Sequence, residues 1–279
     1  MKKISRRSFL AAAGLSVAAL ALTACGGSSS SVASSVASSA AASSEAASTS
    51  AAAELTTVEA GKLTMATNAA FPPYEMTTDA GEFEGIDIDT AKAIAEKLGL
   101  ELQIDDMDFD AALLSVQQGK ADIVMAGVTV TDERKAVMDF SDSYATGIQS
   151  IIVPEGSDIT SPDDLAGKKI GTQRGTTGYI YCSDDFGDDA VVAYDDGLTA
   201  VQALNNGQVD AVVIDNAPAK EFVAANPGLV ILDTSYAEED YAIGLAKGSA
   251  LEDAVNAALE ELKADGTLQS IVDKYITAE

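Results

Sequence analysis

The sequence contains no histidine and only two cysteines. The absence of histidine removes the usual general base, the commonest metal ligand and the one unperturbed side chain that titrates near neutral pH. It therefore argues against many hydrolases and zinc enzymes. Basic residues are also scarce, with 17 Lys and Arg against 44 Asp and Glu and a formal net charge of −27. Such a charge repels phosphate backbones and anionic lipid headgroups, so nucleic acid is not an expected partner.

The first 24 residues have the organisation of an export signal. Basic residues precede an apolar stretch from Phe9 to Leu22, which is too short to span a bilayer comfortably. LTAC, ending at Cys25, resembles a bacterial lipobox, in which the preceding peptide is removed and the cysteine is lipidated. We therefore expect residues 1–24 to be a signal peptide and Cys25 to carry a lipid anchor on the outer face of the cytoplasmic membrane. SRRSFL also resembles a twin-arginine signal, so the Sec and twin-arginine routes both stay open.

Residues 25–59 are predicted to be the lipidated cysteine followed by a disordered tether. From Gly26 to Ala53 the chain is almost entirely serine and alanine. Such a segment cannot bury enough surface to offset the entropy cost of ordering. A flexible tether of this kind suits an anchored domain that must move above a membrane.

Neither thiol nor metal chemistry is expected in the rest of the chain. Cys182 is left without a partner for a disulfide, and nothing near it in the sequence supplies a base or a second thiol, so it is predicted to be a packing residue. The acid-rich segments 105–110 and 184–189 lack the glycine, the terminal glutamate or the alternating spacing of a calcium loop. We therefore predict no metal and no cofactor.

The chain after the tether alternates predicted strands and helices, which indicates an α/β fold with mostly parallel sheets. KLTMAT is predicted to be a strand. The stretch after Asp89 places apolar residues at helical spacing up to Leu98 and stops at Gly99, and LELQI then alternates like a strand.

Two segments of the chain resemble each other. LLSVQQGKADIVMAG, ending at Gly127, matches ALNNGQVDAVVID, ending at Asp215, and Asp122 and Asp210 within them share the same offset of 88. Each predicts a helix, a glycine stop, a strand and a loop, although chance similarity of two βα units is the alternative. Ligands of open α/β sheets bind beyond the carboxyl ends of strands. Four such ends are therefore expected to line a cleft between two lobes, near Asn68, Gly127, Gln173 and Asp215.

Longer motifs carry a family resemblance. TNAAFPPYE, GIDIDTAKAIAEKLG, SPDDLAGKKIGTQRGTTG and NNGQVDAVVID occur in an order that resembles the family-3 bacterial solute-binding proteins of ABC importers, from about Gly61 to the C-terminus. The resemblance implies two Rossmann-like lobes joined by a two-strand hinge, as in type II periplasmic binding proteins. The implied boundaries are 60–146 plus 240–279 for the first lobe and 147–239 for the second, in a monomer.

Arg134 is the first candidate for ligand binding. It falls in the first turn of a helix that Thr131 is expected to cap, where the helix dipole disfavours a cation. A guanidinium can grip a carboxylate through two parallel hydrogen bonds. The resemblance assigns the α-carboxylate of an amino acid to this arginine, with the Thr129 hydroxyl and the Gly127 backbone nearby. A surface ion pair with a neighbouring acid is the alternative.

The resemblance assigns the remaining site residues as well. Asp215, in the other lobe, is expected to bind the α-ammonium, unless it only caps a turn. Phe71 and Phe109 are expected to sandwich the aliphatic part of the ligand, with core packing as the alternative. Residues of the first strand and of GTQRGTTG complete the predicted site: Asn68, Gln173, Thr176 and Thr177. Asn68 replaces an aspartate of many binders of cationic amino acids, which argues against such a ligand.

The predicted function is binding of a free polar amino acid outside the cytoplasm and its delivery to an ABC permease with its ATPase. The protein is not expected to be an enzyme. One alternative is an enzyme of the same fold that resembles cyclohexadienyl dehydratases, in which carboxylates such as Asp215 or Glu75 would have to act. The other is a sensory or interaction lipoprotein on the cell surface.

Overall fold

The strands of the computed structural model, which describes residues 55–276, form two larger sheets. The first sheet has the order β5-β1-β6-β14-β7. Its members are β5 (Glu101–Asp106), β1 (Lys62–Thr67), β6 (Ile123–Val124), β14 (Gly244–Ala246) and β7 (Met138–Phe140). A small antiparallel sheet follows β1 along the chain and consists of β2 (Ala70–Phe71), β3 (Glu75–Thr77) and β4 (Phe83–Glu84).

The second sheet has the order β10-β9-β11-β8-β12, with β13 also paired to β8. Its members are β10 (Val191–Tyr194), β9 (Ile170–Gln173), β11 (Ala211–Asp215), β8 (Ala145–Pro154), β12 (Leu229–Ile231) and β13 (Ala237–Tyr241). Three neighbouring strands of each sheet run parallel, whereas β14 in the first sheet and β8 in the second run antiparallel to their partners. The α/β class is confirmed. The sheets are mixed rather than mostly parallel. Their antiparallel strands lie where the chain passes directly from one sheet to the other, from β7 to β8 and from β13 to β14.

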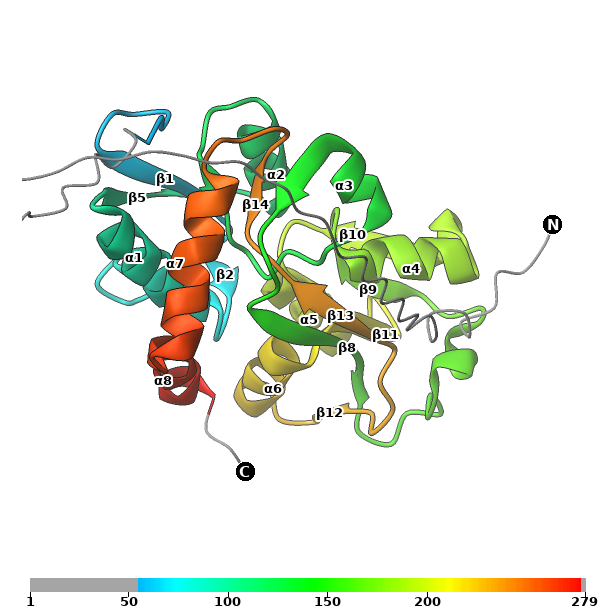
Figure 1. Cartoon of the computed structure of the whole chain (residues 1–279). Coiled ribbons are helices and arrows are strands. Elements are labelled where there is room, and N and C mark those ends of the chain that lie inside the picture. The colour runs from blue at the N-terminus through cyan, green and yellow to red at the C-terminus, as the bar shows by residue number, and fades with distance from the viewer. Residues whose placement is uncertain (1–54, 277–279) are drawn as a thin grey trace, which may run out of the picture. The chain divides into compact units, whose positions relative to one another are not determined.

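Helices cover both sheets and complete two lobes (Figure 1). The helices of the first lobe are α1 (Ile86–Leu98), α2 (Phe109–Gln117), α3 (Asp132–Val137), α7 (Glu252–Ala264) and α8 (Thr267–Tyr275). The helices of the second lobe are α4 (Thr177–Phe186), α5 (Gly197–Asn205) and α6 (Asn216–Ala225). The lobes are joined by β8, which follows β7, and by β13, which precedes β14, and these two strands pair antiparallel. We refer to β8 and β13 together as the hinge ribbon.

The first predicted helix is confirmed, although it begins earlier than expected. α1 ends at Leu98, and Gly99 adopts a left-handed conformation with φ 69°. Its N-terminus lies at Ile86, after Gly85, and not after Asp89. A Cβ at Gly85 would lie 2.1 Å from the Tyr74 carbonyl oxygen, so glycine allows the chain to pass close to β3 before the helix starts. The early acidic residues then stabilise the first turn.

The internal repeat corresponds to two similar βα units. In each unit the aspartate after the helix fixes the start of a neighbouring strand: the Asp122 carboxylate accepts from the Thr64 N–H at 2.8 Å, and the Asp210 carboxylate accepts from the Lys169 N–H at 2.7 Å. The glycine stops before them share φ 66°. Asp122 also accepts from the Val58 N–H, which attaches the segment before β1 to the first lobe.

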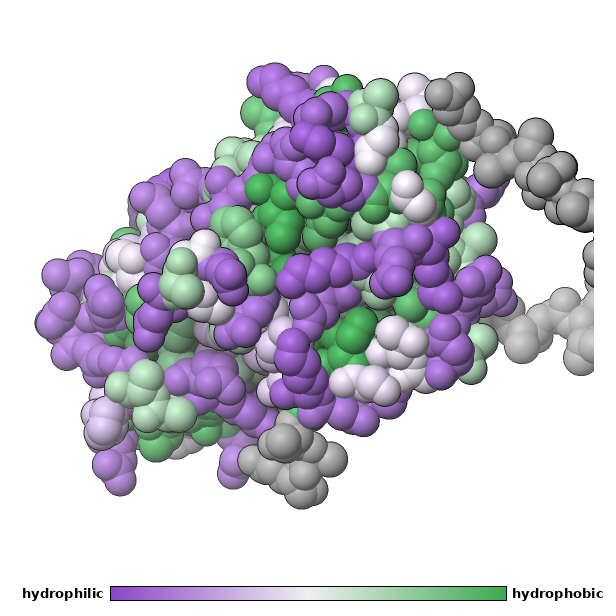
Figure 2. All heavy atoms as spheres, turned by 90° about the vertical axis from the view of Figure 1, so that its left-hand side faces the viewer, coloured by the Kyte–Doolittle hydropathy of each residue, from purple (hydrophilic) through white to green (hydrophobic). Residues whose placement is uncertain are grey.

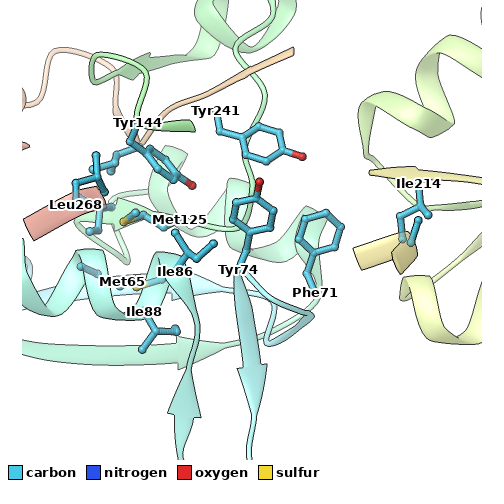
Figure 3. Packing of buried hydrophobic residues seen from close by; sticks show 14 of the residues in the cluster. Met65, Phe71, Tyr74, Ile86, Ile88, Met125, Tyr144, Ile214, Tyr241 and Leu268 are labelled. Carbon is cyan, nitrogen blue, oxygen red and sulfur yellow. The ribbon is translucent and has the colours of Figure 1, made fainter. Parts of the chain in front are cut away.

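Buried apolar side chains fill the space between the sheets and their helices. In the first lobe, Figure 3 shows Met65, Ile86, Ile88 and Met125 packed together. The rings of Phe71, Tyr74 and Tyr241 lie toward Ile214 of the second lobe. Cys182 is fully buried in a cluster of the second lobe, which confirms that it is a packing residue. Burial raises the pKa of its thiol to about 12, so the thiolate form is suppressed.

The molecular surface is largely polar. On the face where α1 and α7 lie, Figure 2 shows mainly hydrophilic residues, with smaller apolar areas between them. No helix within residues 55–276 has the length and apolar character needed to cross a membrane. The predicted signal peptide, the Cys25 anchor and most of the predicted tether lie outside the described residues.

Candidate functional site

One cavity collects all ten residues predicted to contact a ligand. About 310 Å³ of its space is free of protein atoms, including the part open to solvent. Its lining consists of Asn68, Phe71, Glu75, Phe109, Ala126, Gly127, Thr129, Arg134, Gln173, Thr176, Thr177 and Asp215.

The ends of four strands bring these side chains together. Asn68 directly follows β1, and Gly127 lies shortly after β6. Gln173 and Asp215 are the last residues of β9 and β11 in the other lobe. The two lobes therefore present the carboxyl ends of their parallel strands to the same space, as expected for open α/β sheets.

Arg134 is held rigidly at the edge of this cavity. Thr131 caps α3, since its side chain accepts from the Arg134 N–H at 3.2 Å. The guanidinium donates to the Thr129 carbonyl at 2.8 Å and, across the lobes, to the Gly175 carbonyl at 3.1 Å, and it lies 5.3 Å from the centre of the Phe109 ring. Burial lowers the pKa of Arg134, but an arginine stays protonated in proteins. The remaining N–H groups can therefore donate to an anion.

Asp215 provides the opposite charge from the second lobe. Its carboxylate accepts hydrogen bonds from the Tyr241 hydroxyl and, at 2.7 Å, from the Gln149 amide, both on the hinge ribbon. The side chain is almost completely buried. Burial is the main cause that raises the pKa of Asp215 to about 7, and the nearby Glu239 acts in the same direction.

A second hydrogen bond between the lobes crosses the cavity next to these charges. The Gln173 amide, in the second lobe, donates to the Asn68 side-chain oxygen at 2.8 Å. Asn68 in turn donates to the Met107 carbonyl at 3.0 Å, which fixes its orientation. This hydrogen bond therefore forms only when the two lobes are close together.

Phe71, which lines the cavity, belongs to a group of three packed aromatic rings. Phe71 stacks on Tyr74 with their centres 5.8 Å apart, and Tyr74 meets the Tyr241 ring edge-on (Figure 3). A Cβ at Gly127 would lie 2.9 Å from the Phe71 ring and 3.3 Å from the Tyr241 ring. Gly127 also has φ 54°, so this position needs glycine for both its conformation and its space.

Glu75 is a fully buried carboxyl group in the cavity lining. Neither of its carboxyl oxygens makes a well-aligned hydrogen bond within the described part of the chain, but the Asp87 carboxyl group lies close enough to share a proton with it. Burial, together with the charge of Asp87, raises the pKa of Glu75 well above its ordinary value. Burial also raises the pKa of Asp87 to about 6, although hydrogen bonds from Gly127 and Tyr144 oppose this rise. An unpaired buried carboxyl group is costly unless it is neutral or meets a cation.

The hydroxyls of the two threonines at the start of α4 are less available to a ligand than the sequence indicates. The Thr176 hydroxyl donates to the Gln173 carbonyl at 2.8 Å and accepts from the Tyr179 N–H, which makes it the cap of α4. The Thr177 hydroxyl donates to Glu239 at 2.9 Å. The only proton of each hydroxyl is thus already committed within the protein.

A model of the bacterial extracellular solute-binding proteins, family 3, matches residues 63–278. The chain belongs to this family. A probable histidine-binding protein of Neisseria gonorrhoeae is 33% identical over 96% of the chain and 95% of its own length. The L-cystine-binding protein TcyJ of Escherichia coli is 33% identical over 79% of the chain and 85% of its own length.

The fold agrees with solved members of the family. The arginine-, lysine-, histidine-binding protein ArtJ of Geobacillus stearothermophilus matches with a TM-score of 0.75 and 34% identity, over 78% of the chain and 96% of its own length. The two-lobed architecture expected from the sequence is confirmed by this similarity. The ligands in these names differ from one relative to the next, so the family alone does not select a ligand.

Sequence reasoning missed the layer of residues beneath the site of this solute-binding protein. Gln149, Glu239 and Tyr241 all lie on the hinge ribbon and bind site residues, as described above for Asp215 and Thr177. A glutamine inside the apolar run GIQSIIV was a usable signal, because a buried polar residue needs partners. No such signal marks Glu239 in the sequence, because it stands in the acidic run AEED.

Proposed function

We propose that this solute-binding protein captures a free amino acid between its lobes and delivers it to an ABC importer. The observation that supports the proposal most is the pair of opposite charges on one cavity: Arg134 from the first lobe and Asp215 from the second. An α-carboxylate can take the free N–H groups of Arg134, and an α-ammonium can pair with Asp215. Because these groups come from different lobes, a bound zwitterion favours the closed arrangement.

We propose that the ligand carries a cationic side chain. Glu75 is buried, lines the cavity and lies beside another acid, Asp87, so a guanidinium or ammonium would offer it a cationic partner. Phe71 and Phe109 offer apolar surface for the intervening methylene groups. The amide of Asn68 is already bound by Gln173 and Met107, so Glu75 is the acid of the cavity lining that is left for the ligand's side chain once Asp215 pairs with the α-ammonium.

A calorimetric screen of the twenty amino acids and cystine tests this proposal. We expect L-arginine to bind most tightly, and Glu75→Gln to weaken L-arginine by about 10- to 100-fold while changing L-glutamine by less than about threefold. Glu82→Gln, an exposed change of the same charge near the same small sheet, is the control. Binding of no amino acid would refute the function, whereas equal losses for both ligands would refute only the cationic side chain.

We propose that the protein works as a monomer without catalysis, with lobe boundaries at 60–146 plus 240–279 and 147–239. We propose that Cys25 carries the lipid that holds it at the outer face of the cytoplasmic membrane. Mass spectrometry of the membrane fraction tests the anchor, because the proposal predicts a diacylglyceryl cysteine at the mature N-terminus and Cys25→Ala a released protein.

A further inference from the structure

Glu239 lies on the hinge ribbon, at a point where both lobes reach it. It is 7% exposed and stands opposite Gly147 in the pairing of β13 with β8. A Cβ at Gly147 would lie 2.4 Å from the Tyr241 ring, so this glycine leaves room for the ring that contacts Asp215. The cleft-facing side of the ribbon therefore carries polar groups directly beneath the cavity.

One oxygen of Glu239 collects hydrogen bonds from both lobes. Its Oε2 accepts from the Thr129 hydroxyl at 3.0 Å, from the Thr177 hydroxyl at 2.9 Å and from the Gln149 amide at 3.1 Å. Thr129 belongs to the loop of the first lobe that leads to Arg134, and Thr177 is the first residue of α4 in the second lobe. The same carboxylate thus fixes two residues that line the cavity from opposite sides.

These bonds decide what the two hydroxyls can offer a ligand. A hydroxyl has one proton to donate and lone pairs to accept with. Because both protons point to Glu239, the oxygens of Thr129 and Thr177 can only accept from a group in the cavity. Acceptors suit an ammonium and disfavour a carboxylate.

We propose that Glu239 is a positioning residue that makes Thr129 and Thr177 acceptors and so completes, with Asp215, a subsite for the ligand's α-ammonium. The inference rests on the proposed function and deepens it. It gives Thr129 a role toward the ammonium, where the sequence had suggested the carboxylate. It also explains why an acid without an obvious ligand contact is buried at the junction of the lobes.

Selectivity for the ammonium tests this role, since a purely structural role would weaken all ligands alike. The probes are L-arginine and 5-guanidinopentanoate, which lacks only the α-amino group; if the wild type prefers L-glutamine, glutamine and its des-amino analogue replace them. We expect Glu239→Leu, which removes the acceptor of both hydroxyl protons, to weaken the amino acid by about 10- to 100-fold and to change the des-amino analogue by less than about threefold.

Glu238→Leu is the matched control, because it makes the same change one residue earlier, at an exposed position, and should change neither affinity. An unchanged ratio of the two affinities in Glu239→Leu would overturn the inference alone. A wild type that binds no amino acid would overturn the proposed function and the inference with it. If Glu239→Leu does not fold, Thr177→Val decides the question: a loss confined to the amino acid supports the inference, and an unchanged ratio overturns it.

Discussion

Replacing Arg134 by alanine is expected to weaken amino-acid binding by about 100- to 1,000-fold, because truncating one partner of a buried hydrogen-bonded charge pair costs several kcal/mol. The guanidinium is the cation in the cavity lining, and its packing on Phe109 and its bond to the Thr129 carbonyl hold it in one orientation. The Thr129 and Gly175 carbonyls would also lose their donor in the variant. Isothermal titration calorimetry with the preferred amino acid measures the loss.

Arg174→Ala provides the control for this experiment. Arg174 directly follows Gln173, its side chain is 55% exposed, and it pairs only loosely with Asp195 at 3.6 Å. Its loss removes the same charge close to the cavity without touching the cavity lining. We expect affinity to stay within about threefold of wild type, as for an exposed ion pair. An Arg134→Ala variant that binds as tightly as Arg174→Ala would show that the site is assigned to the wrong cation.

Replacing Asp215 by asparagine is expected to weaken binding by about 100-fold and to reduce its pH dependence near neutrality. In the ligand-free protein the pKa of Asp215 is raised to about 7, and only the ionised form can pair with an ammonium. The affinity of the wild type should therefore fall as the pH is lowered from about 8 to about 6. Calorimetry across this range, with Asp195→Asn as an exposed control, measures both effects.

The same raised pKa has the opposite effect on the stability of the ligand-free protein. The folded protein keeps the Asp215 proton up to about pH 7, whereas an unfolded chain releases it near the ordinary value of 3.8. This contribution to the free energy of unfolding is fully present below about pH 4 and is lost as the pH rises to about 7. The wild type, relative to Asp215→Asn, should thus lose stability between about pH 4 and about pH 7. Binding that does not change with pH would contradict the role of Asp215.

The strand ends of the site could be predicted because they follow from local sequence. A strand pattern that ends in polar residues, repeated after the same offset, places Gly127 and Asp215 at corresponding points of two βα units. The carboxyl ends of the parallel strands then determine which edge of each sheet faces the ligand. Phe71 and Phe109 could be assigned to the site only from the family motifs, because composition alone does not distinguish a ligand contact from core packing.

The layer beneath the site could not be predicted, because its meaning depends on contacts between distant segments. Glu239 accepts from Thr129, which is 110 residues away, and the acidic run around it looks like any solvated loop. Glu75 shows the same difficulty, since its burial beside Asp87 depends on how the small sheet folds against the first lobe. The direction of the threonine hydroxyl bonds likewise emerges only when the hinge ribbon is in place.

The central claim is that Arg134 and Asp215 hold the two charged ends of one amino acid between the lobes. A crystal structure of the protein with its preferred amino acid tests this most directly. The account predicts the α-carboxylate within hydrogen-bond distance of the Arg134 guanidinium and the α-ammonium on Asp215 and the Thr129 hydroxyl oxygen. An amino acid bound with its charged ends reversed, or outside this cavity, would contradict it.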